Sequence, residues 1–197
     1  LWIKEADTGL RADNIRDDQW IGPTAALNSA FLVGERLQER LLERDYEFVH
    51  FIAHSAGAGV VTAASEALQP QTFQCTFLDA FARDGRAKEY GVKAWADHYF
   101  VRFSSDRLPW TQERLRHAHN VDVTQLDRPN GAGLYGDFGS GLFSAHAAPR
   151  VFYRDTIEAP VFPGSEGYGF PLTREASPGT WPAREMEYYF GRPAVVL

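Results

Sequence analysis

A serine followed by small residues stands at the end of an apolar run near residue 50. The run Phe48–Ala53 is rich in β-branched and aromatic side chains, and it ends at His54 and Ser55 before the small residues of 56–59. This pattern is typical of a strand that turns sharply into a helix with a serine at the turn. The hydroxyl of Ser55 would then lie beside a helix N-terminus, which favours developing negative charge. The chemistry that this arrangement allows is nucleophilic attack on an acyl carbon.

The pentapeptide 53–57 also has a second interpretation. It matches the pattern Gly-x-Ser-x-Gly with Ala53 in place of the first glycine and Gly57 as the second, small residues that a strained nucleophile turn requires. In an ordinary strand-to-helix turn, however, the serine caps the helix instead of reacting. The apolar strand before Ser55 and the alanine-rich helix after it favour a nucleophile. Gly59 is expected to let that helix approach the sheet closely.

A serine nucleophile needs a base, and the base needs a carboxylate that fixes its tautomer. His146 is the candidate base, because it closes the glycine-rich stretch 129–141 and precedes a short helix that we expect to start at Pro149. A histidine on such a loop could extend back over the edge of the sheet. His146 is one of six histidines, so the other five must be weighed as well.

The remaining histidines fit this role less well. His50 and His98 lie inside predicted strands, and His54 is expected to point away from the nucleophile and to serve in packing or as a pocket wall. His117 and His119 lie in a polar stretch and are predicted at the surface. Their His-x-His spacing is a weak metal signal, because no cluster of carboxylates completes a site.

Three aspartates are candidates for the acid. Asp79 directly follows the predicted strand 73–78, and functional groups in parallel α/β sheets gather beyond the carboxyl ends of strands. Asp106, after the predicted strand 98–103, is the alternative acid, and Asp122 is the third candidate. A helix N-cap or a loop carboxylate remains the other interpretation of Asp79.

Composition limits the other functions of the chain. A length of 197 residues suits one domain, and a net charge of −6 without a basic run argues against a nucleic-acid partner. The single cysteine, Cys75, excludes an intramolecular disulfide and a cysteine-based zinc site. No apolar stretch has the length of a membrane span. The chain starts at Leu1 rather than at methionine, so we expect it to begin within a longer protein, with a strand and half of an oxyanion hole upstream.

The order of predicted elements indicates an α/β fold with a mainly parallel sheet and flanking helices. We expect a helix from 22 to about 44, whose apolar face comprises Ala26, Ala30, Val33, Leu37 and Leu41. Further elements are expected as strand 47–53, helix 56–68, strand 73–78, strand 98–103, an edge strand near 120–123 and a short helix over 149–157. The chain is interpreted as one domain, 1–197, with a catalytic core of about 22–157 and an irregular covering segment over 158–197.

Three segments together resemble the α/β-hydrolase superfamily, and most closely its lipase branch. Residues 53–57 resemble the nucleophile elbow, and Thr76–Ala80 resembles the Gly-Leu-Asp-Pro-Ala segment of pancreatic-type lipases, in which the aspartate is the triad acid. Ser144–Pro149 with Val151–Tyr153 resembles the histidine loop and closing helix. The chain departs from the family in Phe77 and Ala80, which replace glycine and proline. It also lacks the family's disulfides and its amino-terminal histidine-glycine oxyanion segment.

The resemblance implies a serine hydrolase that cleaves carboxylic esters of small molecules or lipids through an acyl-enzyme. Ser55, His146 and Asp79 would form the triad, the N–H of Ala56 would be one oxyanion donor, and no metal or organic cofactor would be needed. Apolar side chains would form a lid or acyl-binding wall, or else cover the edge of the core: Leu134, Tyr135, Phe138, Leu142 and Phe143. Analogy with the family suggests secretion or export. The alternatives are a non-catalytic binding module of the same fold, and an acyl hydrolase acting on amides or thioesters.

Overall fold

The structure is a computed structural model. It describes residues 21–69, 72–82, 90–92, 95–102, 111–123, 142–158, 168–173, 187–189 and 192–194. The backbone alone is described for residues 21–25, 142–145, 172, 187–189 and 192–194.

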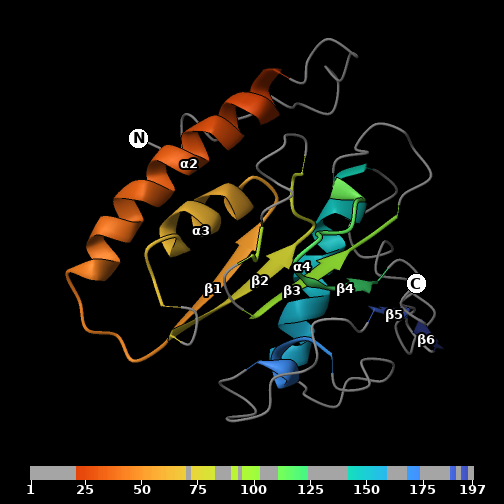
Figure 1. The fold of residues 1–197 in the computed structure, drawn as a ribbon. Coiled ribbons are helices and arrows are strands. Elements are labelled where there is room, and N and C mark those ends of the chain that lie inside the picture. Colours follow the sequence, from red (N-terminus) through yellow and green to blue (C-terminus); the bar gives the residue numbers. More distant parts are fainter. Residues whose placement is uncertain are drawn as a thin grey trace.

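Parallel strands in chain order form the centre of the fold. The four strands are β1 (Val49–His54), β2 (Phe73–Leu78), β3 (Trp95–Phe100) and β4 (His119–Asp122), and each pairs in parallel with the next. Two short strands continue the sheet beyond β4: β5 (Glu187–Tyr189) is parallel to β4, and β6 (Arg192–Ala194) is antiparallel to β5. Figure 1 shows the arrows of β1 to β4 pointing the same way, so their carboxyl ends meet at one edge.

Helices cover both faces of the sheet. Helix α3 (Gly57–Ser65) lies on one face, and the long helix α2 (Ile21–Leu42) packs on its outer side (Figure 1). Helix α4 (Leu142–Glu158) crosses the opposite face, next to the 3₁₀ turn η5 (Phe170–Leu172). The described part of the chain is therefore an α/β domain with a four-stranded parallel sheet and flanking helices.

Two hydrophobic cores follow from the alternation of side chains along the strands. Phe77 belongs to the core under α2 and α3, whereas its neighbour Leu78 belongs to the core under α4. All residues of β2 and of β3 are buried, as expected for parallel strands that are covered on both faces. The strand that the sequence predicts over residues 73–78 has the observed bounds.

Glycines bring α2 and α3 into close contact. A Cβ built on Gly34 would lie 2.4 Å from the carbonyl oxygen of Val60, and one on Gly59 would lie 3.0 Å from Leu27 Cδ1. Gly59 therefore allows α3 to approach α2, and not the sheet as expected from the sequence. The buried face of α2 is also rotated from the predicted one, since Leu27 is buried while Leu37 is 36% exposed.

Two central elements differ from their predicted bounds. β3 begins at Trp95 rather than at residue 98, because the carboxyl of Asp97 is accommodated by Thr76, whose Oγ1 donates to Asp97 Oδ1 at 2.6 Å. β4 was expected at an edge, but β5 pairs with its outer side. The partner strand comes more than sixty residues later in the chain, which a local pattern does not indicate.

The carboxyl-terminal elements also differ. α4 begins at Leu142 and contains Pro149 in its interior, so Pro149 does not start the helix and His146 lies in the helix instead of on a loop. Proline is most common in the first helical turn, which is why the sequence suggested a start there. The segment after 158 was expected to be irregular, yet it contributes η5, β5 and β6.

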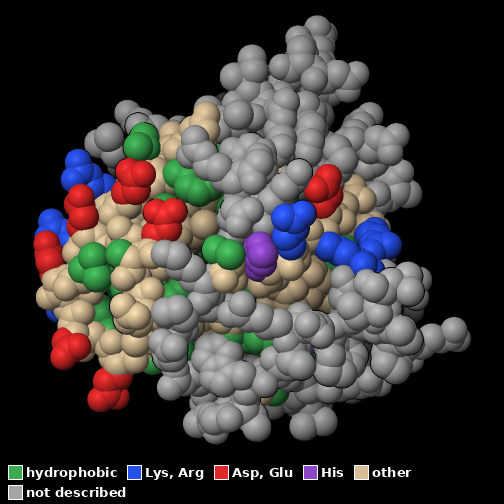
Figure 2. Space-filling view, viewed as in Figure 1, with side chains coloured by type: hydrophobic (Ala, Val, Ile, Leu, Met, Phe, Trp, Pro, Cys, Tyr) green, Lys and Arg blue, Asp and Glu red, His purple; other side chains and the backbone are tan. Residues whose placement is uncertain are grey.

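The solvent face of α2 carries interspersed charges (Figure 2). Arg36 pairs with Glu39 at 3.1 Å and Arg40 with Glu43 at 2.9 Å, and such exposed pairs contribute little to stability. None of the described helices has the length and hydropathy needed to span a membrane.

Candidate active site

Ser55 lies in a tight turn between β1 and α3. Its φ angle is 55°, in the left-handed region that few residues other than glycine adopt. The backbone of the turn is held on both sides: Ser55 N–H donates to Leu78 O at 3.1 Å, and Ser55 O accepts from Phe81 N–H at 3.1 Å and from Ala58 N–H at 3.2 Å. Such strained, well-held residues are concentrated at functional sites.

Ser55 does not cap α3. The N-cap position is Ala56, and no side chain makes a capping hydrogen bond there. The interpretation of Ser55 as a helix cap is therefore wrong. The N–H of Ala56 has no acceptor within the described parts of the chain, so it is free to donate to a group beside Ser55.

The small residues on either side of Ser55 face each other. A Cβ built on Gly57 would lie 3.8 Å from the Cβ of Ala53, which is an ordinary van der Waals contact. A methyl group would thus fit at position 57, and only a longer side chain would meet Ala53. The requirement for small residues around the turn is less strict than the sequence pattern suggested.

Asp79 lies at the end of β2, next to the turn of Ser55. Its φ angle is 47°, and its side chain is fully buried. The backbone N–H donates to Tyr99 O at 2.8 Å, and Oδ1 accepts from Val101 N–H at 3.3 Å. Asp79 is thus held at the carboxyl edge of the sheet by the neighbouring strand β3.

His146 of α4 contacts this carboxylate directly. Its Nδ1 lies 2.5 Å from Asp79 Oδ2, and its side chain is 17% exposed. Because a carboxylate accepts hydrogen bonds, Nδ1 carries the proton and Nε2 of the neutral ring has a free lone pair. A histidine held in this tautomer by a buried carboxylate can act as a general base.

The hydrogen bond between the serine and the histidine of a triad is not formed in this structure. Among the described residues, Ser55 Oγ makes no hydrogen bond with His146. Catalytic hydrogen bonds are often long in the absence of substrate and shorten when it binds. The turn of Ser55 and that of Asp79 are nevertheless joined directly through the bond between Ser55 N–H and Leu78 O.

His54 has a closer relation to the site than the sequence indicated. Its Nε2–H donates to the backbone carbonyl of His146 at 2.8 Å, and the two rings lie 4.5 Å apart at 40°. Burial, and to a lesser extent the charge of His146, lower the pKa of His54 from 6.5 to about 4. The packing role that the sequence suggested is present, but its partner is the candidate base itself. The alternation of side chains along β1 is the signal that was missed. It places His54 on the same face of the sheet as His50, and α4 packs against that face near His54.

His98 supports the segment after Asp79 from the opposite face of the sheet. Its Nδ1–H donates to Asn120 Oδ1 at 3.1 Å, and its Nε2 accepts from the N–H of Ala80 at 3.3 Å. Burial lowers the pKa of His98 from 6.5 to about 4, so the ring is neutral and can accept this bond. A histidine that the sequence placed within a strand thus helps to hold the turn of Asp79.

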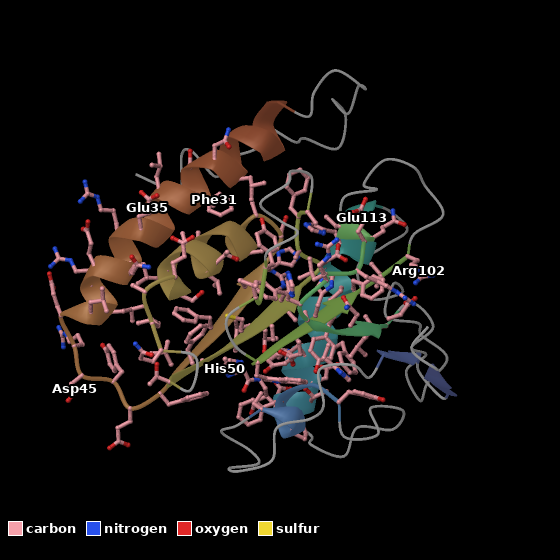
Figure 3. All side chains as sticks on the ribbon, viewed as in Figure 1. Phe31, Glu35, Asp45, His50, Arg102 and Glu113 are labelled. Carbon is pink, nitrogen blue, oxygen red and sulfur yellow. The ribbon has the colours of Figure 1, made fainter. Side chains whose placement is uncertain are left out.

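The other predicted site residues lie elsewhere. Asp106 lies outside the described residues, as do Leu134, Tyr135 and Phe138, and α4 contains Leu142 and Phe143. Asp122 forms an ion pair with Arg102 at 3.2 Å, at the end of β4. Figure 3 shows Arg102 and His50 at opposite ends of the sheet.

Two histidine assignments away from the site can be checked. His50 Nε2 donates to Thr76 Oγ1 at 2.9 Å, as expected for a satisfied histidine of the sheet face. His119 is only 1% exposed, so its predicted position at the surface is wrong. It is buried beside β3, where its ring lies 5.6 Å from that of Trp95. Within the described residues, no three histidine, cysteine or acidic side chains are grouped as metal ligands.

Comparisons with known proteins identify no relative. No protein-family model, no curated protein and no solved structure matches the chain. What is shown is therefore an α/β domain with a four-stranded parallel sheet and flanking helices, without an assigned family.

Proposed function

We propose that the chain is a serine hydrolase of the α/β-hydrolase fold that cleaves carboxylic esters, in the manner of lipases and esterases. The observation that carries the proposal is the contact between Asp79 and His146 beside the turn of Ser55. A buried carboxylate that holds a histidine in its Nδ1–H tautomer, close to a serine at left-handed φ, is the arrangement that serine hydrolysis requires.

In the proposed reaction, Ser55 Oγ attacks the ester carbonyl while His146 Nε2 takes its proton. Asp79 stabilises the imidazolium that forms, and His146 then delivers the proton to the leaving alcohol. The N–H of Ala56 donates to the oxyanion, because Ala56 follows the nucleophile and is the N-cap of α3. Water, activated by His146, releases the acid from Ser55.

Labelling with a fluorophosphonate probe tests the activated serine. We expect the wild-type protein to label, Ser55→Ala to lose labelling, and His146→Ala and Asp79→Asn to label at least about 100-fold more slowly, because both the base and its orientation are needed. Asp122→Asn is the matched control, since Asp122 is paired with Arg102, and it should label at the wild-type rate.

A folded wild-type protein that does not label would contradict the proposal and favour a binding module. Labelling that persists in Ser55→Ala would place the nucleophile elsewhere. If the protein labels, hydrolysis rates on acyl esters of increasing chain length determine which acyl group it prefers. Rates on matched amides and thioesters determine which type of bond it cleaves.

A further inference from the structure

The backbone of Asp79 is held by β3 on both sides of its Cα. In the peptide before it, Asp79 N–H donates to Tyr99 O at 2.8 Å. In the peptide after it, Ala80 N–H donates to His98 Nε2 at 3.3 Å. Because each peptide is planar, these two bonds fix both backbone angles of Asp79 and thus the direction in which its side chain leaves the backbone. The turn has a φ angle of 47° at Asp79, so its conformation depends on such support.

One of these two partners is a side chain that has more than one protonation state. A neutral imidazole carries its proton on Nδ1 or on Nε2, and only the ring with the proton on Nδ1 can accept from Ala80 N–H. The imidazolium has a proton on both nitrogens and would also break this bond. The support of the turn therefore requires one of the two neutral tautomers of His98.

The side chain of Asn120 determines this tautomer. Its Nδ2 donates to the carbonyls of Leu115 and Ala118, each at 2.8 Å, and its Oδ1 accepts from Leu115 N–H at 2.9 Å. The amide cannot be turned over, because its oxygen would then face two carbonyl oxygens. Oδ1 is thus the atom that meets His98 Nδ1 at 3.1 Å, and the ring proton lies on Nδ1. Both side chains are buried, so solvent does not compete for these bonds.

We infer that Asn120 and His98 are positioning residues for the candidate acid. Asn120 keeps the lone pair of His98 on Nε2, and this lone pair holds the peptide after Asp79. The carboxylate of Asp79 is thereby directed at His146 Nδ1. A neutral hydrogen bond contributes about as much as the left-handed conformation costs a residue with a Cβ, so the loss of this one bond is enough to release the turn. The consequence for activity rests on the proposed serine hydrolase, whereas the consequence for the contact between Asp79 and His146 does not.

Nuclear magnetic resonance of the wild-type protein with isotope-labelled histidine tests the first step. We expect long-range proton–nitrogen correlations to show His98 as the Nδ1–H tautomer at neutral pH. The Nδ1 proton of His146 should give a far-downfield resonance, because its bond to the buried carboxylate of Asp79 is short. The absence of this resonance from His146→Gln assigns it.

Two variants of His98 test the positioning itself. His98→Phe keeps a ring to stack on Phe100, at a centroid distance of 5.2 Å in the wild type, and removes the acceptor, whereas His98→Gln removes the ring and keeps an acceptor for Ala80 N–H. His98→Phe should move the His146 resonance upfield or abolish it. It should also lower the limiting rate of fluorophosphonate labelling about five-fold, with an unchanged probe concentration at half-saturation.

The conservative variant and a control complete the test. His98→Gln should keep the His146 resonance and label within about two-fold of the wild type. Gln38→Met is the matched control, because it removes a hydrogen bond from a side chain to the backbone carbonyl of Ala63, between α2 and α3. It should match the wild type in both measurements.

Three results would overturn the inference: a wild-type His98 with its proton on Nε2, a folded His98→Phe with the wild-type resonance and labelling rate, or a His98→Gln as impaired as His98→Phe. If His98→Phe does not fold, the wild-type tautomer and the resonance in His98→Gln decide. A wild-type protein that shows the predicted tautomer and resonance but does not label would contradict the proposed hydrolase and support the positioning of Asp79.

Discussion

The hydrogen bond from His54 to the carbonyl of His146 leads to a prediction on how the base is positioned. The bond is directional, whereas the contact between the two rings tolerates sliding. For the proposed mechanism we therefore expect the donor at position 54, more than the ring, to keep His146 in the position from which it activates Ser55. His54→Phe retains a ring and removes the donor, and His54→Gln retains a donor and removes the ring.

The expected size follows from the energy of one neutral hydrogen bond. Such a bond contributes about 1 kcal/mol, and 1.36 kcal/mol corresponds to a ten-fold change in rate. His54→Phe should therefore lower the limiting rate of fluorophosphonate labelling about five-fold, with an unchanged probe concentration at half-saturation. His54→Gln should stay within about two-fold of the wild type, with the same pH dependence above pH 5, because His54 with a pKa of about 4 is already neutral there.

The assay separates positioning from a loss of stability. Urea unfolding of each variant shows whether the fold is kept at the labelling temperature. His50→Gln serves as a control, since His50 lies on the same strand and bonds to Thr76 instead. The reasoning is refuted if His54→Phe labels at the wild-type rate, or if His54→Gln is the slower variant, because the ring contact would then position the base.

Two further predictions concern stability. The pKa of His98 is about 4 in the folded protein and 6.5 in the unfolded chain, so the unfolded state binds more protons between these values. This histidine should therefore lower the free energy of unfolding by about 2 kcal/mol between pH 7 and pH 5. Urea titrations should show a pH dependence smaller by that amount in His98→Gln, and an equal dependence would contradict the burial argument. Gly34→Ala should lower the free energy of unfolding by about 2 kcal/mol, because its Cβ would lie 2.4 Å from Val60 O. Glu35→Ala, at the next residue and on the exposed face of α2, should change the free energy of unfolding by less than about 0.5 kcal/mol. Equal values for the two variants would show that α2 and α3 can move apart at no cost.

Elements whose signal is local could be predicted from the sequence. The strand over residues 73–78 was predicted with its observed bounds because four of its six residues are apolar and because Pro70 and Asp79 flank it. The same local pattern placed Asp79 directly after the end of this strand. The turn of Ser55 was predicted because small residues on both sides of a serine are a local consequence of its left-handed backbone.

Features that depend on distant partners could not be predicted. His119 was predicted at the surface because its neighbours in sequence are polar, but it is buried beside β3, where it pairs with Asp97 and its ring lies 5.6 Å from that of Trp95. The contact of His54 with His146 joins residues 92 positions apart, and it depends on which face of the sheet α4 crosses. The length of α4 was missed because its interior proline resembles a helix start.

The left-handed backbone at Ser55 and Asp79 affects the stability of the folded state. A residue with a Cβ costs about 1 kcal/mol in that conformation, and glycine would avoid the cost. At Ser55, whose Oγ makes no hydrogen bond with the described residues, folding alone would therefore favour glycine, and the turn would keep its backbone hydrogen bonds. At Asp79 the cost of the backbone is offset, because the side chain accepts hydrogen bonds from Val101 N–H and from His146 Nδ1–H. A search for stabilising substitutions would accordingly select against the candidate nucleophile first.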